Sequence, residues 1–330
     1  QGYQVQVFGQ ADGASHRANM RHASLTETSA RPVGNPRLQE INQALVISTN
    51  AAGYALLRRF VQDNPTFGGL FREGLIRTIP ANGATPGVDL AVQSAVHQRP
   101  WIRGHAPGPV TSIPVASLGS AVKSVDQALR CPGYSVPVLD LMRVLSASLA
   151  RAGVRFIEGR LSAAQMDELS AQGGNVIIAT GADQPGIVPV KGWFVRLPAA
   201  DGEGDTGTGV KVHHPLPVGV MNVRRDGAEL LISGGQVPPQ PDHAQVQRVK
   251  DMVLAAARQH FPASFAKAQC EGRLQVAECV RPGSADGLSR IERTAARQIH
   301  AGATSAGGFT QALVLSLFVR ELLRRSPGED

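Results

Sequence analysis

Two segments of the chain contain residues that could do chemistry, and the first lies near residue 300. His300 to Ala312 (HAGATSAGGFTQA) is a run of small residues that leads directly into a helical pattern. Glycine and alanine let a backbone approach a flat or anionic ligand, and the free N–H groups at a helix start attract negative charge. The segment therefore suits a phosphate or a ring carbonyl. Taken alone, it is equally consistent with a plain tight turn.

The second segment is VRPGSADG over residues 280–287, in which Arg281 stands between a short apolar strand and a Pro-Gly turn. A guanidinium held rigidly at such a place can clamp a substrate carboxylate, because its planar fork donates two parallel charge-assisted hydrogen bonds. For an isolated arginine, a surface position or a structural salt bridge is the commoner interpretation, and the segment by itself favours that.

Other candidates for chemistry are weaker. His213 and His214 are adjacent, so in a strand they point to opposite faces, and we expect them on a loop or surface rather than in a metal site. Cys131 is expected to fill space as a small apolar residue. The three cysteines, Cys131, Cys270 and Cys279, include no C-x-x-C pair, which predicts free thiols in a reducing compartment. No G-x-S-x-G motif or triad spacing is present.

The elements expected to position these residues begin with a short strand over residues 3–8. Asn35 suits a helix N-cap and Pro36 the first helical position, and apolar residues then recur at helical spacing as far as Phe60, with Gly53 as a point where the helix can break. Residues 64–133 have the short apolar pieces between Pro and Gly that are typical of an antiparallel region.

A helix, a strand and a second strand follow. Residues 138–149 keep one apolar face and Gly153 suits the C-terminal cap, then 154–157 predicts a strand. Residues 175–181 are continuously apolar, as in strands buried on both faces of a parallel sheet, so the order indicates a doubly wound unit. The remaining predictions are a strand over 190–197, a hairpin of 218–224 with 228–233 around Asp226-Gly227, an amphipathic helix over 246–257, and a buried helix over 309–325.

Composition narrows the function classes. The 330 residues carry a net charge of +7, but the arginines occur singly or in pairs and aromatics make up only 5%, which argues against a dedicated nucleic-acid site. No apolar run approaches the roughly 20 residues needed to span a bilayer, and no targeting segment is visible. We expect a soluble, cytoplasmic protein with no metal.

The order of the motifs resembles the FAD-dependent amino-acid and amine oxidoreductases typified by D-amino-acid oxidase and glycine oxidase. The likeness spans nearly the whole chain and no single motif decides it. It is carried by an Ala-Thr-Gly turn at 179–181, Lys191-Gly192-Trp193, the Arg-Arg-Asp-Gly hairpin at 224–227, the R-P-x-x-x-D-G turn at 281–287 and the terminal A-G-x-x-x-x-G-G-F-T segment at 301–310.

This resemblance implies an α/β fold in which an FAD-binding, Rossmann-like, three-layer domain is interleaved with an antiparallel-sheet substrate domain. The FAD-binding domain would comprise 1–50, 137–188 and 285–330, and the substrate domain 51–136 and 189–284. Arg281 would be the catalytic-site residue that binds the substrate carboxylate. The implied cofactor contacts are Ser15, Arg17, Asn19, Thr180, Gly181, Gly302, Ser305, Ala306, Gly307, Gly308, Phe309 and Thr310.

Some positions depart from the family pattern. In the family, a G-x-G-x-x-G fingerprint joins a strand to a helix that holds the pyrophosphate. We do not expect this fingerprint in these residues, and by position it would precede Gln1. Gly9-Gln10 replaces the acidic residue that would bind the adenosine ribose, and Trp193 stands where the family usually has Gln. The first βα unit of the FAD-binding domain is therefore expected to be missing.

The implied chemistry is hydride transfer from the carbon that bears an amine to the flavin, which gives an imine that water hydrolyses. The substrate would be an amine or an amino acid. One alternative within the same fold acts on a carboxymethylaminomethyl group of a tRNA wobble uridine, so tRNA is a possible but less favoured partner. The other is a truncated or degenerate, non-catalytic relative that does not hold FAD.

Overall fold

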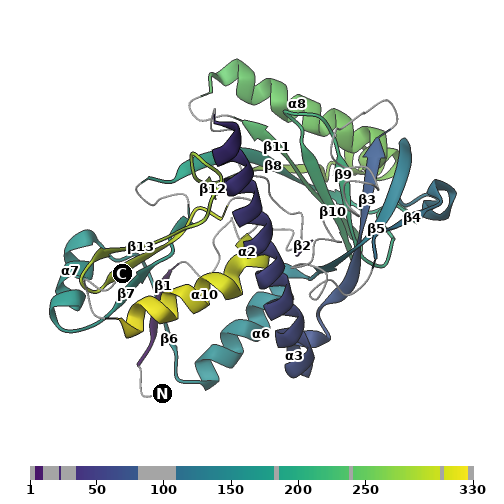
Figure 1. The fold of residues 1–330 in the computed structure, drawn as a ribbon. Helices are drawn as coiled ribbons and strands as arrows, with labels where there is room; N and C mark the ends of the chain where they lie inside the picture. Colours follow the sequence, from purple (N-terminus) through teal and green to yellow (C-terminus); the bar gives the residue numbers. More distant parts are fainter. Residues whose placement is uncertain are drawn as a thin grey trace.

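The computed structural model describes residues 4–9, 22–23, 35–80, 109–181, 186–237, 241–304 and 308–325. Within these residues, a mixed sheet of nine strands, here called the large sheet, forms the centre of the molecule (Figure 1). Its strand order is β12-β8-β11-β10-β9-β3-β5-β2, with β4 paired to β5 beside this path. Its described pairings are antiparallel except β3 with β9, which is parallel. The strands are β2 (His22–Ala23), β3 (Arg72–Pro80), β4 (Thr111–Ile113), β5 (Val125–Ser135), β8 (Val188–Pro198), β9 (Gly209–His213), β10 (Val220–Asp226), β11 (Glu229–Val237) and β12 (Gln275–Gly283).

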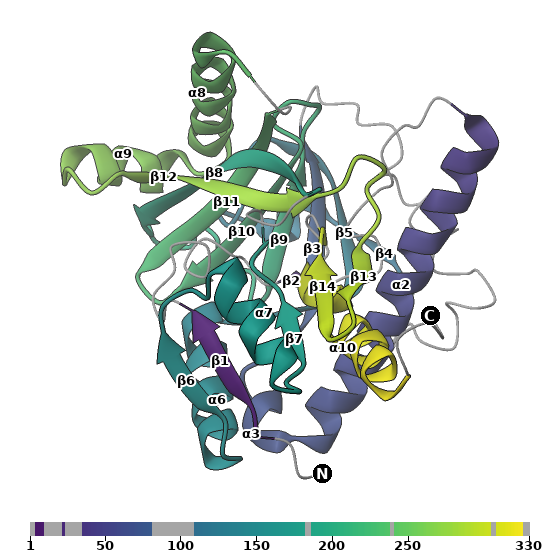
Figure 2. The ribbon, with the colours of Figure 1, turned by 90° about the vertical axis from the view of Figure 1, so that its left-hand side faces the viewer.

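One face of the large sheet is covered by α8 (His243–His260) and α9 (Pro262–Cys270), as Figure 2 shows. Along β9 and β10 apolar residues alternate with polar ones, and the apolar residues meet apolar residues of these helices. The Asp242 side chain starts α8 by accepting the N–H of Gln245 at 2.6 Å. Fully covered members of this core are Val195, Val212, Met221, Val223, Leu230, Ile232, Val253, Ala257, Phe261 and Ala268.

Two further sheets, here called the small sheets, lie on the other side of the large sheet. In one, β1 runs parallel to β6, and in the other β14 runs parallel to β7 and antiparallel to β13. Figures 1 and 2 both place these strands, with α6 and α7, away from α8 and α9. The strands are β1 (Gln6–Gly9), β6 (Arg155–Glu158), β7 (Val176–Ile178), β13 (Arg290–Ala295) and β14 (Gln298–Gly302). The helices of this side include α3 (Pro65–Gly68), α6 (Val138–Arg151) and α7 (Ala163–Ala171). A 3-10 turn, η1 (Val115–Leu118), follows β4.

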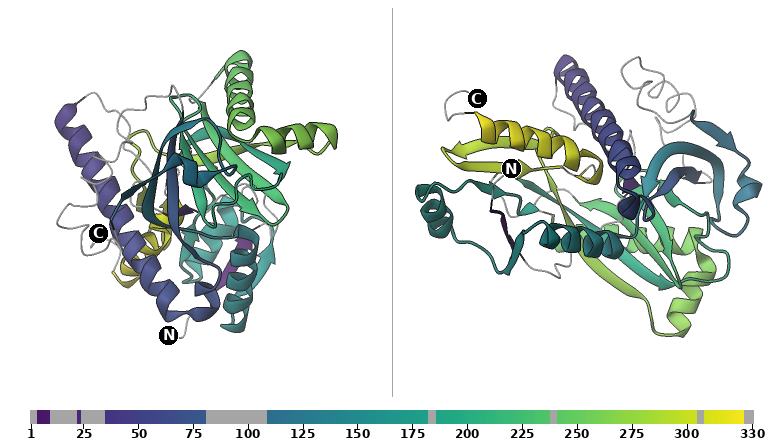
Figure 3. Two further views of the ribbon diagram at one scale, coloured as in Figure 1. Left: turned by 90° about the vertical axis from the view of Figure 1, so that its right-hand side faces the viewer. Right: turned by 90° about the horizontal axis from the view of Figure 1, so that it is seen from below.

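The start of α10 (Gly308–Arg324) packs against α2 (Pro36–Asp63), and the two helices cross at an angle (Figure 3). The expected break near Gly53 does not occur, because α2 continues through it. The glycine has another role there: a Cβ at this position would lie only 2.0 Å from the backbone oxygen of Thr310. The two helices therefore touch backbone to backbone, which only glycine permits.

Several predictions from local sequence signals are confirmed. Asn35 caps α2, since its side chain accepts the N–H of Leu38 at 3.2 Å. The hairpin forms with Asp226 opposite Glu229, and Gly227 in the turn has φ +59°. The helix over 138–149 is α6. The mixed α/β fold class is confirmed in general terms, while the division into an FAD-binding and a substrate domain stays a prediction.

Other predictions are wrong. The strand over 175–181 is shorter, and Ile177 is half-exposed rather than buried on both faces. The closing helix is also not fully buried, since Leu317 and Phe318 face solvent. The exposure of Ile177 and that of Leu317 and Phe318 have the same reason, because β7 and α10 lie at the outer side of the small sheets. His213, expected on a loop or surface, is the last residue of β9 and is buried.

The expectation that G-x-G-x-x-G spacing is nowhere present also needs correction. Gly202, Gly204 and Gly207 have this spacing, in the loop between β8 and β9. A strand rather than a helix follows, so the loop lacks the helix start that binds a pyrophosphate. Its Glu203 instead accepts the N–H of Ser264 at 2.7 Å and of Ala263 at 3.0 Å, at the start of α9.

In the part of the chain that the structure describes, no helix combines the length and apolar character needed to cross a membrane. Nor do three or more His, Cys, Asp or Glu side chains of that part come together as metal ligands.

Candidate functional site

The carboxyl ends of β7 and β14 meet at the start of α10. The strands are parallel and in register, with His300 opposite Ile178, so the segments that leave them lie at the same edge. Thr180 and Gly181 follow β7, Gly302 ends β14, and α10 begins at Gly308. Ligands of parallel α/β sheets bind outside the carboxyl ends of the strands, and a helix start adds free N–H groups and a positive dipole end. The edge is thus suited to a flat, negatively polarised ligand.

This edge has room for a ligand at Gly181. The residue has φ +69°, and a Cβ there would meet no atom of the described residues within 4 Å. Thr180 beside it is exposed. Gly308 is enclosed instead, because its Cβ would lie 2.6 Å from the Thr304 hydroxyl. Among the described residues, space is therefore open at Gly181, whereas Gly308 is in contact with the Thr304 side chain.

Arg281 lies in β12, across from Val190 of β8. Its Nη1 donates to the carbonyl of Gly235 at 2.9 Å, and the side chain is half-buried. A Cβ at Gly192 would lie 2.9 Å from Arg281 Nη2 and 2.7 Å from the Gly235 oxygen. The guanidinium therefore rests over a strand position that has no side chain, and this glycine belongs to the Lys-Gly-Trp motif of the sequence.

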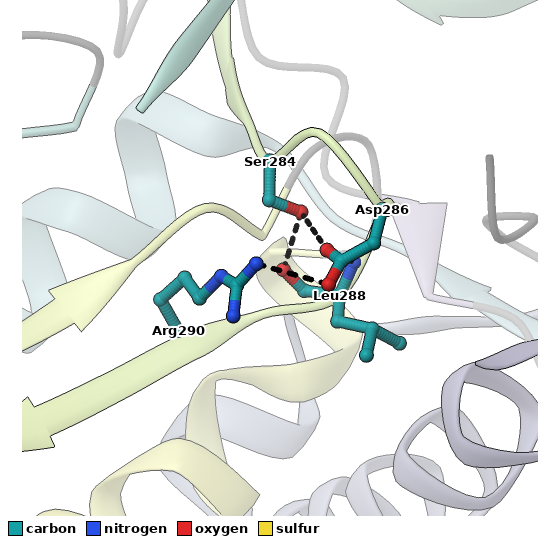
Figure 4. A network of polar contacts seen from close by, with 4 residues as sticks. All are labelled: Ser284, Asp286, Leu288 and Arg290. Carbon is teal, nitrogen blue, oxygen red and sulfur yellow. Dashed lines mark hydrogen bonds and ion pairs between the residues drawn. The ribbon is translucent and has the colours of Figure 1, made fainter. Parts of the chain in front are cut away.

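The turn after β12 is held by one carboxylate (Figure 4). Asp286 accepts the N–H of Leu288 at 3.1 Å and an Arg290 Nη2 hydrogen at 2.9 Å. The Ser284 hydroxyl lies 2.9 Å from Asp286 Oδ1 and 2.7 Å from the Leu288 carbonyl oxygen, so its single proton is shared between two acceptors. Partial burial would raise the pKa of Asp286, but these hydrogen bonds and the Arg290 charge lower it below its ordinary value.

A polar chain ties this turn to the two long helices. The Ser289 hydroxyl donates to Gln311 Oε1 in the first turns of α10, and Gln311 Nε2 donates to Asn50 Oδ1 of α2 at 2.8 Å. Gln311 and Asn50 are buried. The turn that follows Arg281 and the start of α10 are therefore fixed relative to each other. Sequence reasoning missed these three residues, since no local pattern marks a contact between segments so far apart.

Cys279 is a neighbour of Arg281 on the same face of β12. Burial raises the pKa of this thiol, although the Arg281 charge acts in the opposite direction. The thiol is thus protonated at neutral pH and is a poor nucleophile. Burial also raises the pKa of Cys131, in accord with its predicted role as a buried space-filler. Anion binding by Arg281 is the chemistry that this part of the site can perform.

The predicted cofactor contacts fall into three groups. Thr180, Gly181, Gly302 and Gly308 lie together at the edge described above. Phe309 turns its ring into the protein, where it stacks on Phe71 with centroids 6.1 Å apart, and Thr310 is buried against Gly53. The remaining predicted contacts lie outside the described residues: Ser15, Arg17, Asn19, Ser305, Ala306 and Gly307.

The histidine pair is also absent from this edge. His213 Nε2 lies 3.1 Å from Arg77 Nη1, and His214 Nε2 lies 2.9 Å from His260 Nε2. The two rings have different partners, with His213 at the end of β9 and His214 just after it, and they serve the packing of the large sheet.

No family model matches the sequence, and no curated protein sequence matches it. Solved structures do match the fold. Glycine oxidase from Geobacillus kaustophilus superposes with a TM-score of 0.65 at 18% identity, over 99% of this chain and 90% of that one. Iminodiacetate oxidase from Chelativorans sp. BNC1 gives 0.65 at 15% identity, over 100% and 91%. L-amino acid deaminase from Proteus vulgaris gives 0.62 at 12% identity, over 100% and 90%. At these identities the likeness establishes a shared fold.

Proposed function

We propose that the chain is a flavin-dependent oxidoreductase that oxidises the C–N bond of an amino acid or a secondary amine. The observation that supports this most is the meeting of the β7 and β14 carboxyl ends, the start of α10 and the turn after Arg281, held by the Ser289–Gln311 contact. The names of the structures that share the fold point to amine-bearing acids: glycine, iminodiacetate and L-amino acids.

The residues at the edge fit FAD. Gly181 leaves open space beside an exposed Thr180, and α10 is long enough to present a developed positive end to the electron-rich side of the ring. In this proposal Thr180, Gly181, Gly302 and Gly308 hold the cofactor. When bound, FAD supplies the acceptor for a hydride. Residues 1–50, 137–188 and 285–330 would form its domain. Ser15, Arg17, Asn19, Ser305, Ala306 and Gly307 complete the proposed contact set, together with the backbone of Phe309 and Thr310, whose side chains pack inside the protein.

Arg281 binds the substrate carboxylate in this proposal. Only Nη1 has a described hydrogen bond, to the Gly235 carbonyl, so the other side of the guanidinium fork can donate to an acid. Half-burial strengthens such a charge-assisted bond relative to one in open water. With the acid held by Arg281, the position of the amine-bearing carbon is restricted, and the imine formed is hydrolysed by water.

Cofactor binding is the first test. Purified protein should show flavin absorbance, or should gain it when FAD is added, and the fluorescence of FAD should change on titration. A folded protein, checked by circular dichroism, that binds no FAD would contradict the proposal and favour the non-catalytic alternative. Turnover should then be followed with glycine, sarcosine, iminodiacetate and proline, with both oxygen and a dye as electron acceptor.

Arg281→Ala tests the role of the guanidinium. The variant should weaken binding of a carboxylate substrate by about 2–5 kcal/mol, the scale for removal of one partner of a buried charge pair. Arg196→Ala, which removes another arginine from the large sheet, is the matched control and should leave KM unchanged. An unchanged KM in Arg281→Ala, measured on protein that binds FAD and turns over, would remove Arg281 from the site while leaving the FAD proposal intact.

A further inference from the structure

A polar cavity of about 310 Å³ lies at one end of the large sheet, away from Arg281. Strand β8 serves as the reference for the distance between the cavity and Arg281. Arg224 of β10 pairs with Leu231 of β11, which pairs with Arg196 near the end of β8. Arg281 pairs with Val190 near the start of β8. Six residues along a strand correspond to about 20 Å. The cavity is thus a separate place in the fold. Its walls are Arg72, Ser135, Val136, Pro137, Gly204, Asp205, Gly207, Thr208, Arg224, Arg225, Asp226 and Gly227.

Arg224 gives the cavity a buried cation. Its side chain is nine-tenths buried, Nη2 donates to Asp226 Oδ2 at 3.0 Å, and Nη1 donates to the Val136 carbonyl. The Nε hydrogen has no hydrogen-bond partner among the described residues. A buried N–H without an acceptor is unfavourable, and an oxygen of a bound anion would satisfy it.

Arg72 gives the cavity a second cation. It is exposed at the first position of β3, opposite Ser135 of β5, and its guanidinium forms no ion pair within the described part of the chain. Arg225 is different, because its Nε donates to Gly227 and its Nη1 lies 3.2 Å from the carbonyl oxygens of Ala200 and Glu203. Arg225 therefore builds the wall, and Arg72 and Arg224 remain to bind a ligand.

The start of α6 adds to the positive potential. Val136 and Pro137 line the cavity, α6 begins at the next residue, and Pro137 supplies no side-chain cap to its first N–H groups. A helix start favours an anion by its dipole. The glycine-spaced loop contributes less, because the amides of Gly204, Asp205 and Thr206 already donate to carbonyls of the chain.

Two carboxylates also face the cavity. Asp226 is engaged by Arg224, and Asp205 is exposed on the rim. The lining thus has three arginines against two aspartates, an excess of one positive charge. Asp205 would repel an anion from the rim, so its removal should strengthen binding, while removal of Arg72 should weaken it. These opposite signs make the site testable.

We propose that this cavity binds a small oxyanion, a carboxylate or a phosphate group, between Arg72 and Arg224. The planar guanidinium of Arg72 closes on the ligand from the exposed side, and the Nε hydrogen of Arg224 donates to it from the buried side. The ligand would also join β3 and β10 to the start of α6.

Calorimetric titration of the full chain with sodium phosphate and with sodium acetate, at constant ionic strength set by sodium chloride, tests the proposal. Arg72→Gln should bind at least about tenfold more weakly, since hydrogen bonds to charged groups are the strong ones. Asp205→Asn should bind about two- to fivefold more tightly, the scale of an exposed charge pair. Arg59→Gln, which removes an exposed arginine of α2 outside the cavity, should bind like the unaltered protein.

Binding of phosphate alone identifies a phosphate site, binding of acetate alone a carboxylate site, and binding of both a general oxyanion site. Each result supports the proposal when Arg72→Gln weakens that binding at least about tenfold. The proposal is overturned when neither anion binds, when Arg72→Gln binds as before, or when Arg59→Gln loses as much affinity as Arg72→Gln. A loss of affinity in Asp205→Asn also contradicts it. Arg59, Arg72 and Asp205 are not among the proposed FAD contacts, so the anion titration is interpreted independently of flavin binding.

Discussion

The large sheet and the small sheets differ in how completely their apolar residues are covered. Val195, Ile232 and Val253 in the large sheet and its helices are fully buried, whereas Val7 of β1 and Phe156 of β6 are 39% and 48% exposed. Parallel strands in α/β proteins are normally covered on both faces, so the small sheets are unusual in this respect. Burial of apolar surface is the main favourable term in folding.

This difference teaches that the two sides of the molecule have different sources of stability. The large sheet has its own core with α8 and α9, and it supplies most of the burial free energy. The small sheets rely more on contacts with α10, which in turn packs on α2. In the proposed function, bound FAD would stabilise this side by binding the folded state only.

Phe261→Ala should have the largest effect on stability. Phe261 lies between α8 and α9 and is fully buried in the core of the large sheet. Loss of its ring leaves a cavity, which typically costs about 3–5 kcal/mol. Urea unfolding followed by circular dichroism measures this, and a loss below about 1 kcal/mol would contradict the view that this core carries the stability.

Gly53→Ala tests the contact that holds α10 against α2. The added Cβ would lie 2.0 Å from the backbone oxygen of Thr310, and neither backbone can yield easily. We expect a loss of about 1–3 kcal/mol from overpacking, even though alanine is the better helix former. The same measurement applies. Gly69→Ala is the control, because it has φ −62° and its Cβ would meet no atom closer than 3.8 Å.

Local signals in the sequence predicted the elements that depend on neighbouring residues. Asn35-Pro36 marks a helix start because the side-chain oxygen reaches an N–H three residues on, and Asp226-Gly227 marks a hairpin because glycine adopts the positive φ that the turn requires. Such features need no knowledge of the rest of the fold. The motif order of the chain likewise indicated the general architecture found among the solved structures.

Contacts between distant segments could not be predicted in the same way. Gly53 looked like a break in a helix, since the oxygen that excludes a side chain there belongs to Thr310. Asn50, Ser289 and Gln311 have polar side chains of ordinary type, and only the packing of α2 on α10 brings them together. Burial of His213 likewise depends on its place in the middle of the large sheet.

Mild acid should destabilise the large sheet through the His214–His260 pair. The Nδ1 hydrogen of His260 donates to the Lys123 carbonyl at 2.6 Å, so its Nε2 accepts from His214 and both rings are neutral. Burial lowers the pKa of His214 to about 4 and also lowers that of His260. Between this value and the ordinary 6.5, the unfolded chain binds more protons than the folded one, so stability falls as pH falls.

We expect a loss of about 1–2 kcal/mol between pH 7 and pH 5, after allowance for the partial exposure of His214. Urea unfolding at several pH values measures the slope. His214→Gln keeps an N–H donor for His260 but does not titrate, so its slope should be smaller. A slope unchanged by this substitution would assign the acid sensitivity to other groups.

Phe156→Ala should have the smallest effect and completes the comparison with Phe261→Ala. The same ring is removed, but Phe156 lies in β6 with about half of its surface in solvent. Little burial is lost and little cavity forms, so we expect less than about 1 kcal/mol. If Phe156→Ala instead approaches the loss in Phe261→Ala, the small sheets are covered as completely as the large one, and their proposed dependence on a bound ligand fails.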